Sequence, residues 1–143
     1  MIKKLMQRLG RYRVIMDRED NEPYLERYYI FLKDRTWFPF NMFVHKFLKS
    51  DPDEVHDHPW PYCTIILRGG YWEYRPGRSL PEWKGAGEIR FGRSTDYHRI
   101  ELEPGVTPWT LFIPGPKLRD WGFLVKNRWV QHEEYFEQRK LNK

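Results

Sequence analysis

A regular succession of short apolar runs separated by turn residues constrains the fold of this chain most. From residue 28 onward, runs rich in aromatic and β-branched side chains alternate with Gly, Pro, Asn and Asp. The pattern predicts strands over 28–32, 40–47, 62–67, 71–75, 88–91, 98–102, 110–113 and 121–125. About eight short strands at such spacing predict an all-β fold, either a sandwich or a barrel.

The length favours one domain. A chain of 143 residues can bury a single core, and an aromatic content of 17% provides large side chains to fill it. There is no internal repeat and no linker-like stretch. We therefore expect one domain over 1–143, with an N-terminal helix or arm over 1–22, a barrel over 28–125 and a C-terminal segment over 126–143.

Both ends of the chain have short helical patterns. Ile2, Leu5, Met6 and Leu9 share one helical face, which predicts a helix that covers one end of the domain. The alternative is a basic arm for a membrane or nucleic-acid surface. Residues 133–139 predict a closing helix.

Charge and cysteine content limit the partners that we expect. The net charge is +5, from 25 basic and 20 acidic residues that are interleaved along the chain. This favours a solvated surface of mixed charge over a nucleic-acid site. The lone Cys63 cannot form an internal disulfide, which suits a reducing, cytoplasmic location. No apolar run is long enough to span a bilayer, so we expect no membrane partner.

Three histidines predict a metal site. His56 and His58 are one residue apart, so on an extended segment their side chains point to the same side, and His98 follows in a later strand. Three neutral imidazoles on one face leave positions on a divalent ion open for chemistry. The alternative is that these are ordinary polar residues at strand ends. His45 can face the cavity with Phe43 and Phe47 or take a hydrogen-bonded position in the barrel, and we favour the latter. For His132 we favour the surface.

Neighbouring residues can be assigned to a side by the same alternation. Tyr62 and Tyr97 are expected to point away from the metal, unless a bulge intervenes. Glu73 can reach inward as a base, but a pairing with Arg75 or Arg90 is the more common arrangement.

The order His-x-His, a short gap, a strand and then Gly69-Gly70 resembles the first sequence motif of the cupins, and Asp96-Tyr97-His98 resembles the second. The resemblance implies a double-stranded β-helix, or jelly-roll barrel, with short terminal helices. It also implies His56, His58 and His98 as metal ligands and association as a homodimer. Most metal cupins carry a ligating Glu four or five residues after the second His, where this chain has Tyr62 and Cys63.

A cysteine at this position resembles the thiol dioxygenases, above all cysteine dioxygenase, over roughly residues 40–116. The resemblance implies Fe(II) as the metal and a catalytic role for Cys63 beside it. The residue nearest to the position of that family's substrate-binding arginine is Arg27. The tyrosine that the family places after its last histidine has no counterpart in 109–113.

The segment 113–123 is similar to that of small bacterial and phage cupins. It suggests Arg119 and Trp121 at the barrel mouth, where the guanidinium would bind a carboxylate or phosphate. The alternative is a structural pairing of Arg119 with Asp120 and a core position for Trp121.

These residues favour a metal-dependent cupin that acts as a mononuclear non-haem iron oxygenase on a small polar substrate, such as a thiol or an amino-acid-like compound. One alternative is a non-oxidative isomerase, lyase or hydrolase that uses Zn, Ni or Mn. The other is a non-catalytic module that binds a ligand or nucleic acid through its interleaved basic and aromatic residues, namely Arg68, Trp72, Tyr74, Arg75, Arg78, Trp83, Lys84, Arg90 and Arg93.

Overall fold

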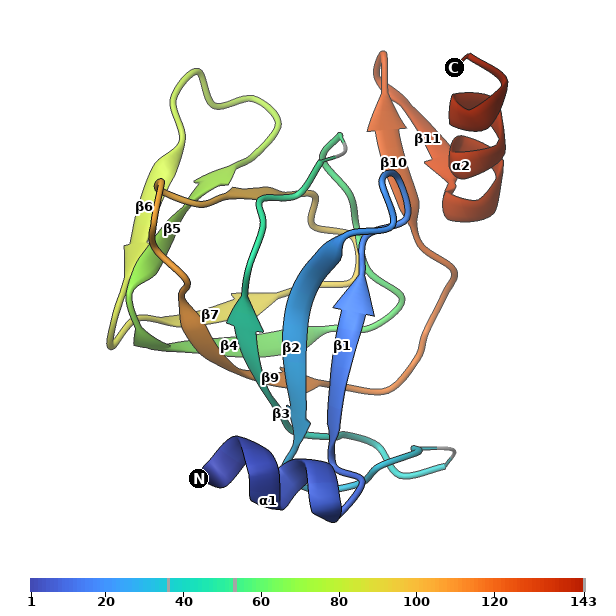
Figure 1. Ribbon diagram of the computed structural model, residues 1–143. Helices are drawn as coiled ribbons and strands as arrows, with labels where there is room; N and C mark the ends of the chain where they lie inside the picture. The colour runs from blue at the N-terminus through green and yellow to red at the C-terminus, as the bar shows by residue number, and fades with distance from the viewer. Residues whose placement is uncertain (36, 53, 143) are drawn as a thin grey trace.

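The computed structural model describes residues 1–35, 37–52 and 54–142. Two short helices flank a series of strands (Figure 1). In chain order the elements are α1 (Ile2–Arg8), β1 (Tyr12–Met16), β2 (Pro23–Tyr29), β3 (Phe43–Phe47), β4 (Tyr62–Arg68), β5 (Gly70–Tyr74), β6 (Glu82–Gly85), β7 (Ile89–Gly92), β8 (Arg99–Glu101), β9 (Trp109–Pro114), β10 (Gly122–Val125), β11 (Arg128–Gln131) and α2 (His132–Leu141).

The strands form a barrel-like arrangement of antiparallel sheets. A six-stranded sheet has the order β1-β2-β3-β9-β4-β7, and a three-stranded sheet has the order β6-β5-β8. A hairpin of β10 and β11 makes a third, smaller sheet, against which α2 packs. This is the all-β jelly-roll architecture with short terminal helices that the sequence predicts.

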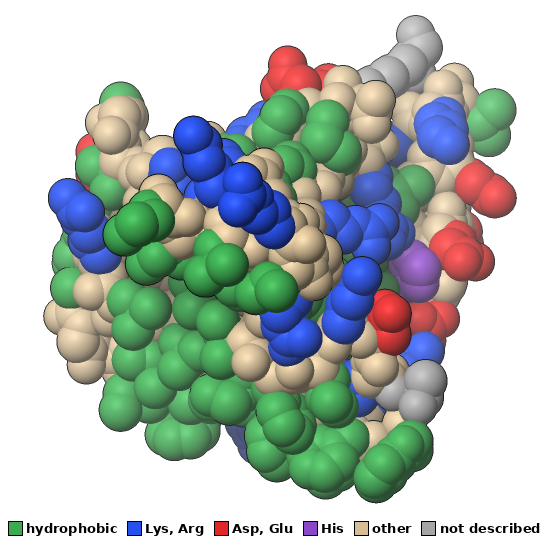
Figure 2. All heavy atoms as spheres, turned by 60° about the horizontal axis from the view of Figure 1, so that its bottom comes forward, with side chains coloured by type: hydrophobic (Ala, Val, Ile, Leu, Met, Phe, Trp, Pro, Cys, Tyr) green, Lys and Arg blue, Asp and Glu red, His purple; other side chains and the backbone are tan. Residues whose placement is uncertain are grey.

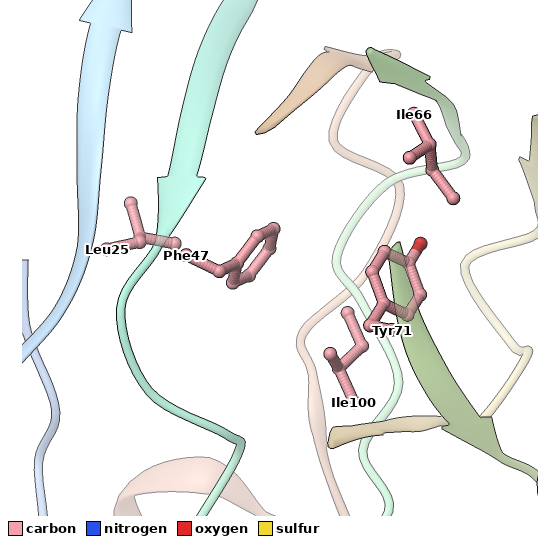
Figure 3. Packing of buried hydrophobic residues seen from close by; sticks show 5 residues of the cluster. All are labelled: Leu25, Phe47, Ile66, Tyr71 and Ile100. Atoms are coloured by element: carbon pink, nitrogen blue, oxygen red, sulfur yellow. The ribbon is translucent and has the colours of Figure 1, made fainter. Parts of the chain in front are cut away.

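The core lies between the two larger sheets. Leu25, Phe47 and Ile66 come from the six-stranded sheet, whereas Tyr71 and Ile100 come from the three-stranded sheet (Figure 3). Burying each such side chain contributes about 1.5–3 kcal/mol, so this cluster holds the two sheets together.

Three strands lie where the sequence analysis expects none. β1 belongs to the predicted N-terminal arm, β6 to a predicted loop and β11 to the predicted C-terminal segment. The hairpin of β10 and β11 turns through Lys126 and Asn127, both with positive φ, at 48° and 63°. Such a turn usually carries Gly, Asn or Asp at both positions. Because Lys126 is not one of these residues, the sequence does not predict the turn.

The N-terminal helix forms as predicted, but it does not bury its apolar side. None of its residues is buried, and Ile2, Leu5 and the following Leu9 are exposed. Lys3 ties the helix to Glu26 of β2 through an ion pair of 2.5 Å. The helix lies at one end of the domain, as expected, but its apolar side chains are left largely exposed (Figure 1). No helix among the described residues is long and apolar enough to cross a membrane.

Candidate metal centre

The structure brings His56, His58 and His98 together at one end of the barrel interior. His56 and His98 face each other across an isolated antiparallel bridge, with N···O distances of 2.9 and 3.0 Å. Each of the three residues offers a ring nitrogen within 4.8 Å of those of the other two. His98 lies forty residues after His58 in the sequence, and this backbone bridge brings it next to His56 in space.

Burial keeps two of the three imidazoles, those of His56 and His58, neutral, which is the form that suits a metal ion. Removal from water lowers the pKa of His56 to about 4 and holds the pKa of His58 well below its ordinary value. The Nδ1 atom of His58 is buried and has no hydrogen-bond partner among the described residues. Neutral nitrogens with free lone pairs are the form in which histidine binds Zn, Fe, Ni or Mn.

A buried carboxylate fixes the segment that carries the histidine pair. Asp57 points away from His56 and His58 and accepts hydrogen bonds from Gly122 N at 2.7 Å and Trp129 Nε1 at 3.1 Å. It also accepts one from Arg119. These three hydrogen bonds hold Asp57 in place, and with it the His-x-His segment whose two rings lie on one side.

A second carboxylate orients the third ligand. Oε2 of Glu73, on β5, lies 3.1 Å from Nδ1 of His98, so the other ring nitrogen of His98 faces the site. Burial opposes ionisation of Glu73, but the His98 contact and Arg75, at 2.8 Å, outweigh it and lower the pKa of this carboxyl. Arg90 adds an ion pair of 3.0 Å without hydrogen-bond alignment. The predicted pairing of Glu73 with both arginines is present.

The three histidines open onto a cavity of about 380 Å³ inside the barrel. Its wall is rich in aromatic side chains. The ring of Trp60 stacks on His58 at 5.4 Å, and Phe112 contacts Trp60 at 5.3 Å. A wall of this kind is suited to limit the access of water to the histidines.

Tyr62 faces this cavity, although the sequence analysis expected it to point away from the metal. Its ring lies 4.6 Å from that of His58, and its buried hydroxyl has no hydrogen-bond partner among the described residues. Tyr62 shares the parity of His56 and His58, and Trp60 between them also lines the cavity, so the alternation of the histidine segment continues into β4. Gly92 on β7 leaves space for the ring, because a Cβ there would lie 2.2 Å from Tyr62 Cζ.

Cys63 consequently lies on the outer side of β4, and the placement implied by the thiol dioxygenase resemblance is corrected. Tyr62 and Thr64 line the cavity, whereas Cys63 does not and pairs with Ile113 of β9 and Phe91 of β7. Burial raises the pKa of its thiol. The side chain has the environment of a small apolar residue in a sheet.

Arg119 also lies elsewhere than expected. Its guanidinium binds Asp57 and donates to Ser94 O at 3.1 Å, and it does not line the cavity. It acts on the site through Asp57, as a positioning residue. Trp121, in contrast, lines the cavity and stacks on His132, with ring centres 4.6 Å apart, so His132 is not a free surface residue.

Two residues that the sequence analysis considered without assigning them to the metal, His45 and Arg27, also line the cavity. His45 is buried between the rings of Phe43 and Phe112 and accepts a hydrogen bond of 3.0 Å from Arg27 Nε. Burial and the adjacent guanidinium keep the pKa of His45 well below its ordinary value. Among the described residues, no carboxylate pairs with Arg27, which leaves a positive charge at the cavity wall.

Several of the basic residues that suggested nucleic-acid binding are engaged elsewhere. Arg75 and Arg90 pair with Glu73 inside the barrel, and Arg78 and Lys84 pair with Glu82. These pairings reduce the positive charge available on that surface.

The fold of this chain is similar to that of several solved structures, whereas its sequence matches no known family. No family model matches the chain, and no curated protein sequence matches it. The polyketide cyclase RemF of Streptomyces resistomycificus superposes with a TM-score of 0.62 at 19% identity, over 90% of this chain and 89% of that one. A cupin 2 conserved barrel domain protein of Rhodopseudomonas palustris gives 0.60 at 11% identity, over 90% and 83%.

A further likeness is to a structure described as Fe(II) HppE, with a TM-score of 0.53 at 16% identity, over 73% of this chain and 57% of that one. At such identities a likeness shows the fold and nothing finer. Together with the antiparallel sheets and the histidine cluster inside the barrel, these likenesses show that the chain has the cupin fold.

Proposed function

We propose that the protein is a mononuclear non-haem iron oxygenase that acts on a small polar substrate of the thiol or amino-acid type. The observation that carries this proposal is the convergence of three imidazoles on a cavity whose wall is rich in aromatic side chains. Iron(II) bound there would supply positions for substrate and O₂ side by side. The Fe(II) description of one structural neighbour supports the choice of metal.

The residues around the histidines have separate tasks in this function. Glu73 and Asp57 hold the ligand side chains in position, and Trp60 and Phe112 keep bulk water out. Arg27 has no carboxylate partner of its own among the described residues and lines the same cavity. It is suited to bind the carboxylate of an amino-acid-like substrate, because a guanidinium offers paired donors to such a group.

The test is metal analysis followed by oxygen uptake. Protein purified without air and loaded with Fe(II) is expected to bind about one ion per chain and to consume O₂ only when a small thiol or amino acid is present. Arg27→Gln is expected to raise the KM for carboxylate-bearing compounds while leaving metal content unchanged. Iron binding without any substrate-dependent oxygen uptake would refute the oxygenase.

A second candidate is a non-oxidative metal enzyme, and Tyr62 favours it. Its buried hydroxyl, free of a described partner, lies beside His58, where a hydroxyl can exchange a proton with a substrate oxygen. Turnover with Zn, Ni or Mn in place of iron, lost in Tyr62→Phe with the metal retained, would select this function. The cyclase among the structural neighbours supports it by analogy of fold alone.

A further inference from the structure

The end of the molecule that carries α1 exposes apolar side chains in two adjacent segments. On the helix and just after it, Ile2, Leu5 and Leu9 are 72%, 54% and 59% exposed. In the loop between β2 and β3, Trp37 is 83% exposed and contacts Phe38 at a ring distance of 5.6 Å. We call these exposed side chains of residues 1–16 and 30–40 the basal surface.

The two segments are joined by hydrogen bonds, so they form one surface and not two separate patches. Arg11 N donates to Met6 O at 2.8 Å, while the Arg11 side chain donates to Tyr29 O at 3.0 Å and to Phe31 O. α1 and the loop between β2 and β3 lie at the lower end of Figure 1, and β1 runs upward from there. Figure 2, in which that end comes forward, shows hydrophobic and basic side chains together over much of this face.

The basal surface carries more positive charge than the whole protein. Residues 1–16 and 30–40 contain seven Lys and Arg and a single acidic residue, Asp34, for a net charge of +6, whereas the whole chain has +5. The remaining residues are therefore close to neutral. One of the cations of the basal surface, Lys3, is paired with Glu26 of β2. Positive charge and exposed apolar groups are concentrated at one end, and the candidate metal centre is elsewhere.

We propose that the basal surface binds a membrane of anionic lipids from one side, with α1 lying in the headgroup region. The short helix presents aliphatic side chains next to Lys4 and Arg8, and Trp37 is a side chain that favours the lipid–water interface. Lys and Arg attract the negative headgroups, while Leu5, Leu9 and Trp37 enter the boundary with the acyl chains. No part of the chain needs to span the bilayer for this.

Charge and side-chain type favour this partner over two others. A second copy of the same surface would bring two charges of +6 together, which opposes association. A nucleic acid would match the charge and could stack on Trp37, but it offers nothing to the aliphatic Ile2, Leu5 and Leu9. Only an anionic lipid surface uses both the cations and the aliphatic groups.

The experiment is co-sedimentation of the full-length protein with vesicles. Binding is expected to vesicles of mixed phosphatidylglycerol and phosphatidylcholine, to fall as salt increases, and to be at least tenfold weaker to phosphatidylcholine alone. The double variant Lys4→Glu/Arg8→Glu and the double variant Leu5→Ser/Trp37→Ser are each expected to weaken binding at least tenfold.

Two matched variants control for general effects of charge and exposure. Arg128→Glu alters an exposed cation at the turn between β10 and β11, and Leu80→Ser alters a leucine that is 77% exposed in the loop before β6. Both are expected to bind vesicles as the parent does. Circular dichroism confirms that each variant is folded, and metal content measured alongside keeps this test separate from that of the proposed function.

Four results would overturn the proposal. They are absence of vesicle binding by the parent, equal binding to neutral vesicles, equal losses in the control variants, and dimerisation in sedimentation equilibrium that Leu5→Ser/Trp37→Ser abolishes. A preference for a single-stranded oligonucleotide over anionic vesicles at the same salt concentration would assign the surface to nucleic acid instead.

Discussion

Two clusters of potential metal ligands lie in the part of the chain that the structure describes, and their comparison shows what makes such a cluster a site. One consists of His56, His58 and His98, and the other of Asp17, Asp20 and Glu22 after β1. The ligand atoms converge equally in both. In the acidic cluster, however, Lys49 Nζ lies 2.7, 3.1 and 2.9 Å from the three carboxylates and occupies their centre.

Among the described residues, no Lys or Arg side chain lies between the three histidines as Lys49 lies between the carboxylates. The nearby carboxylate of Glu73 contacts Nδ1 of His98 and is not itself one of the three candidate ligands. Neutral donors do not repel one another, so they can be held ready in the absence of an ion, whereas three carboxylates need a counter-charge in order to fold. We conclude that convergence alone does not define a metal site. What matters is whether the protein already supplies the positive charge.

Removal of a histidine ligand should have the largest effect. His98→Ala is expected to reduce metal content from about one ion per chain to none, because two imidazoles hold an ion poorly. His132→Gln, outside the cluster, should retain the ion. Elemental analysis after dialysis measures both, with circular dichroism to monitor folding. Full metal retention by His98→Ala would show that the histidine cluster, like the acidic one, is not a metal site.

Loss of the supporting carboxylate should come next. Glu73→Gln keeps the size of the side chain but removes the charge behind His98, and an effect of about 10–100-fold on metal affinity is typical of such partners. Glu101→Gln, in the partly exposed ion pair with Arg99, serves as the matched control. Competition with a chromogenic chelator gives the affinities, and an unchanged affinity in Glu73→Gln would show that His98 is oriented without it.

The acidic cluster allows the reciprocal test. Lys49→Met leaves Asp17, which is buried, and its neighbours without a cation, so the free energy of unfolding should fall by about 1–3 kcal/mol. Calcium should then raise the melting temperature of this variant but not that of the parent. Lys49→Arg should resemble the parent. If Lys49→Met is as stable as the parent, the ammonium does not serve as the internal counter-ion.

The free energy of unfolding should depend on pH differently for the two clusters, and this effect should be smaller than those of the substitutions. Burial lowers the pKa of His56 in the folded protein to about 4, so the unfolded chain binds the extra proton below about pH 6.5. Stability of the metal-free protein should therefore fall between about pH 6.5 and 4, at up to about 1.4 kcal/mol per pH unit for this residue. Denaturant unfolding at several pH values measures it, and His56→Gln should flatten the slope.

For Asp17 the direction differs. Burial raises its pKa, but hydrogen bonds from Lys49 and from backbone amides outweigh burial and lower it. Its contribution is present above the ordinary pKa of an aspartate and is lost only when the pH falls below about 4. A loss of stability that begins only below pH 4 in the metal-free parent would contradict the neutral state of the histidines.

The sequence by itself determined the strands with clear alternation and the choice of the three histidines. Side chains two residues apart on a strand share a face whatever the rest of the chain does, so His56 and His58 could be paired from local geometry. The cupin resemblance then added His98. At β4 the alternation was a better guide than the resemblance, because Tyr62 shares the parity of His56 and His58 and lines the cavity, whereas Cys63 does not.

Only the tertiary structure decided which charges meet. Arg119 binds Asp57, which is 62 residues away in the chain, and Lys49 reaches three carboxylates near β1. Such contacts depend on how the sheets pack around the core, and this packing cannot be predicted from local sequence patterns. The same holds for α1, whose apolar face is recognisable from its sequence, whereas its exposure to solvent depends on what the rest of the fold leaves uncovered.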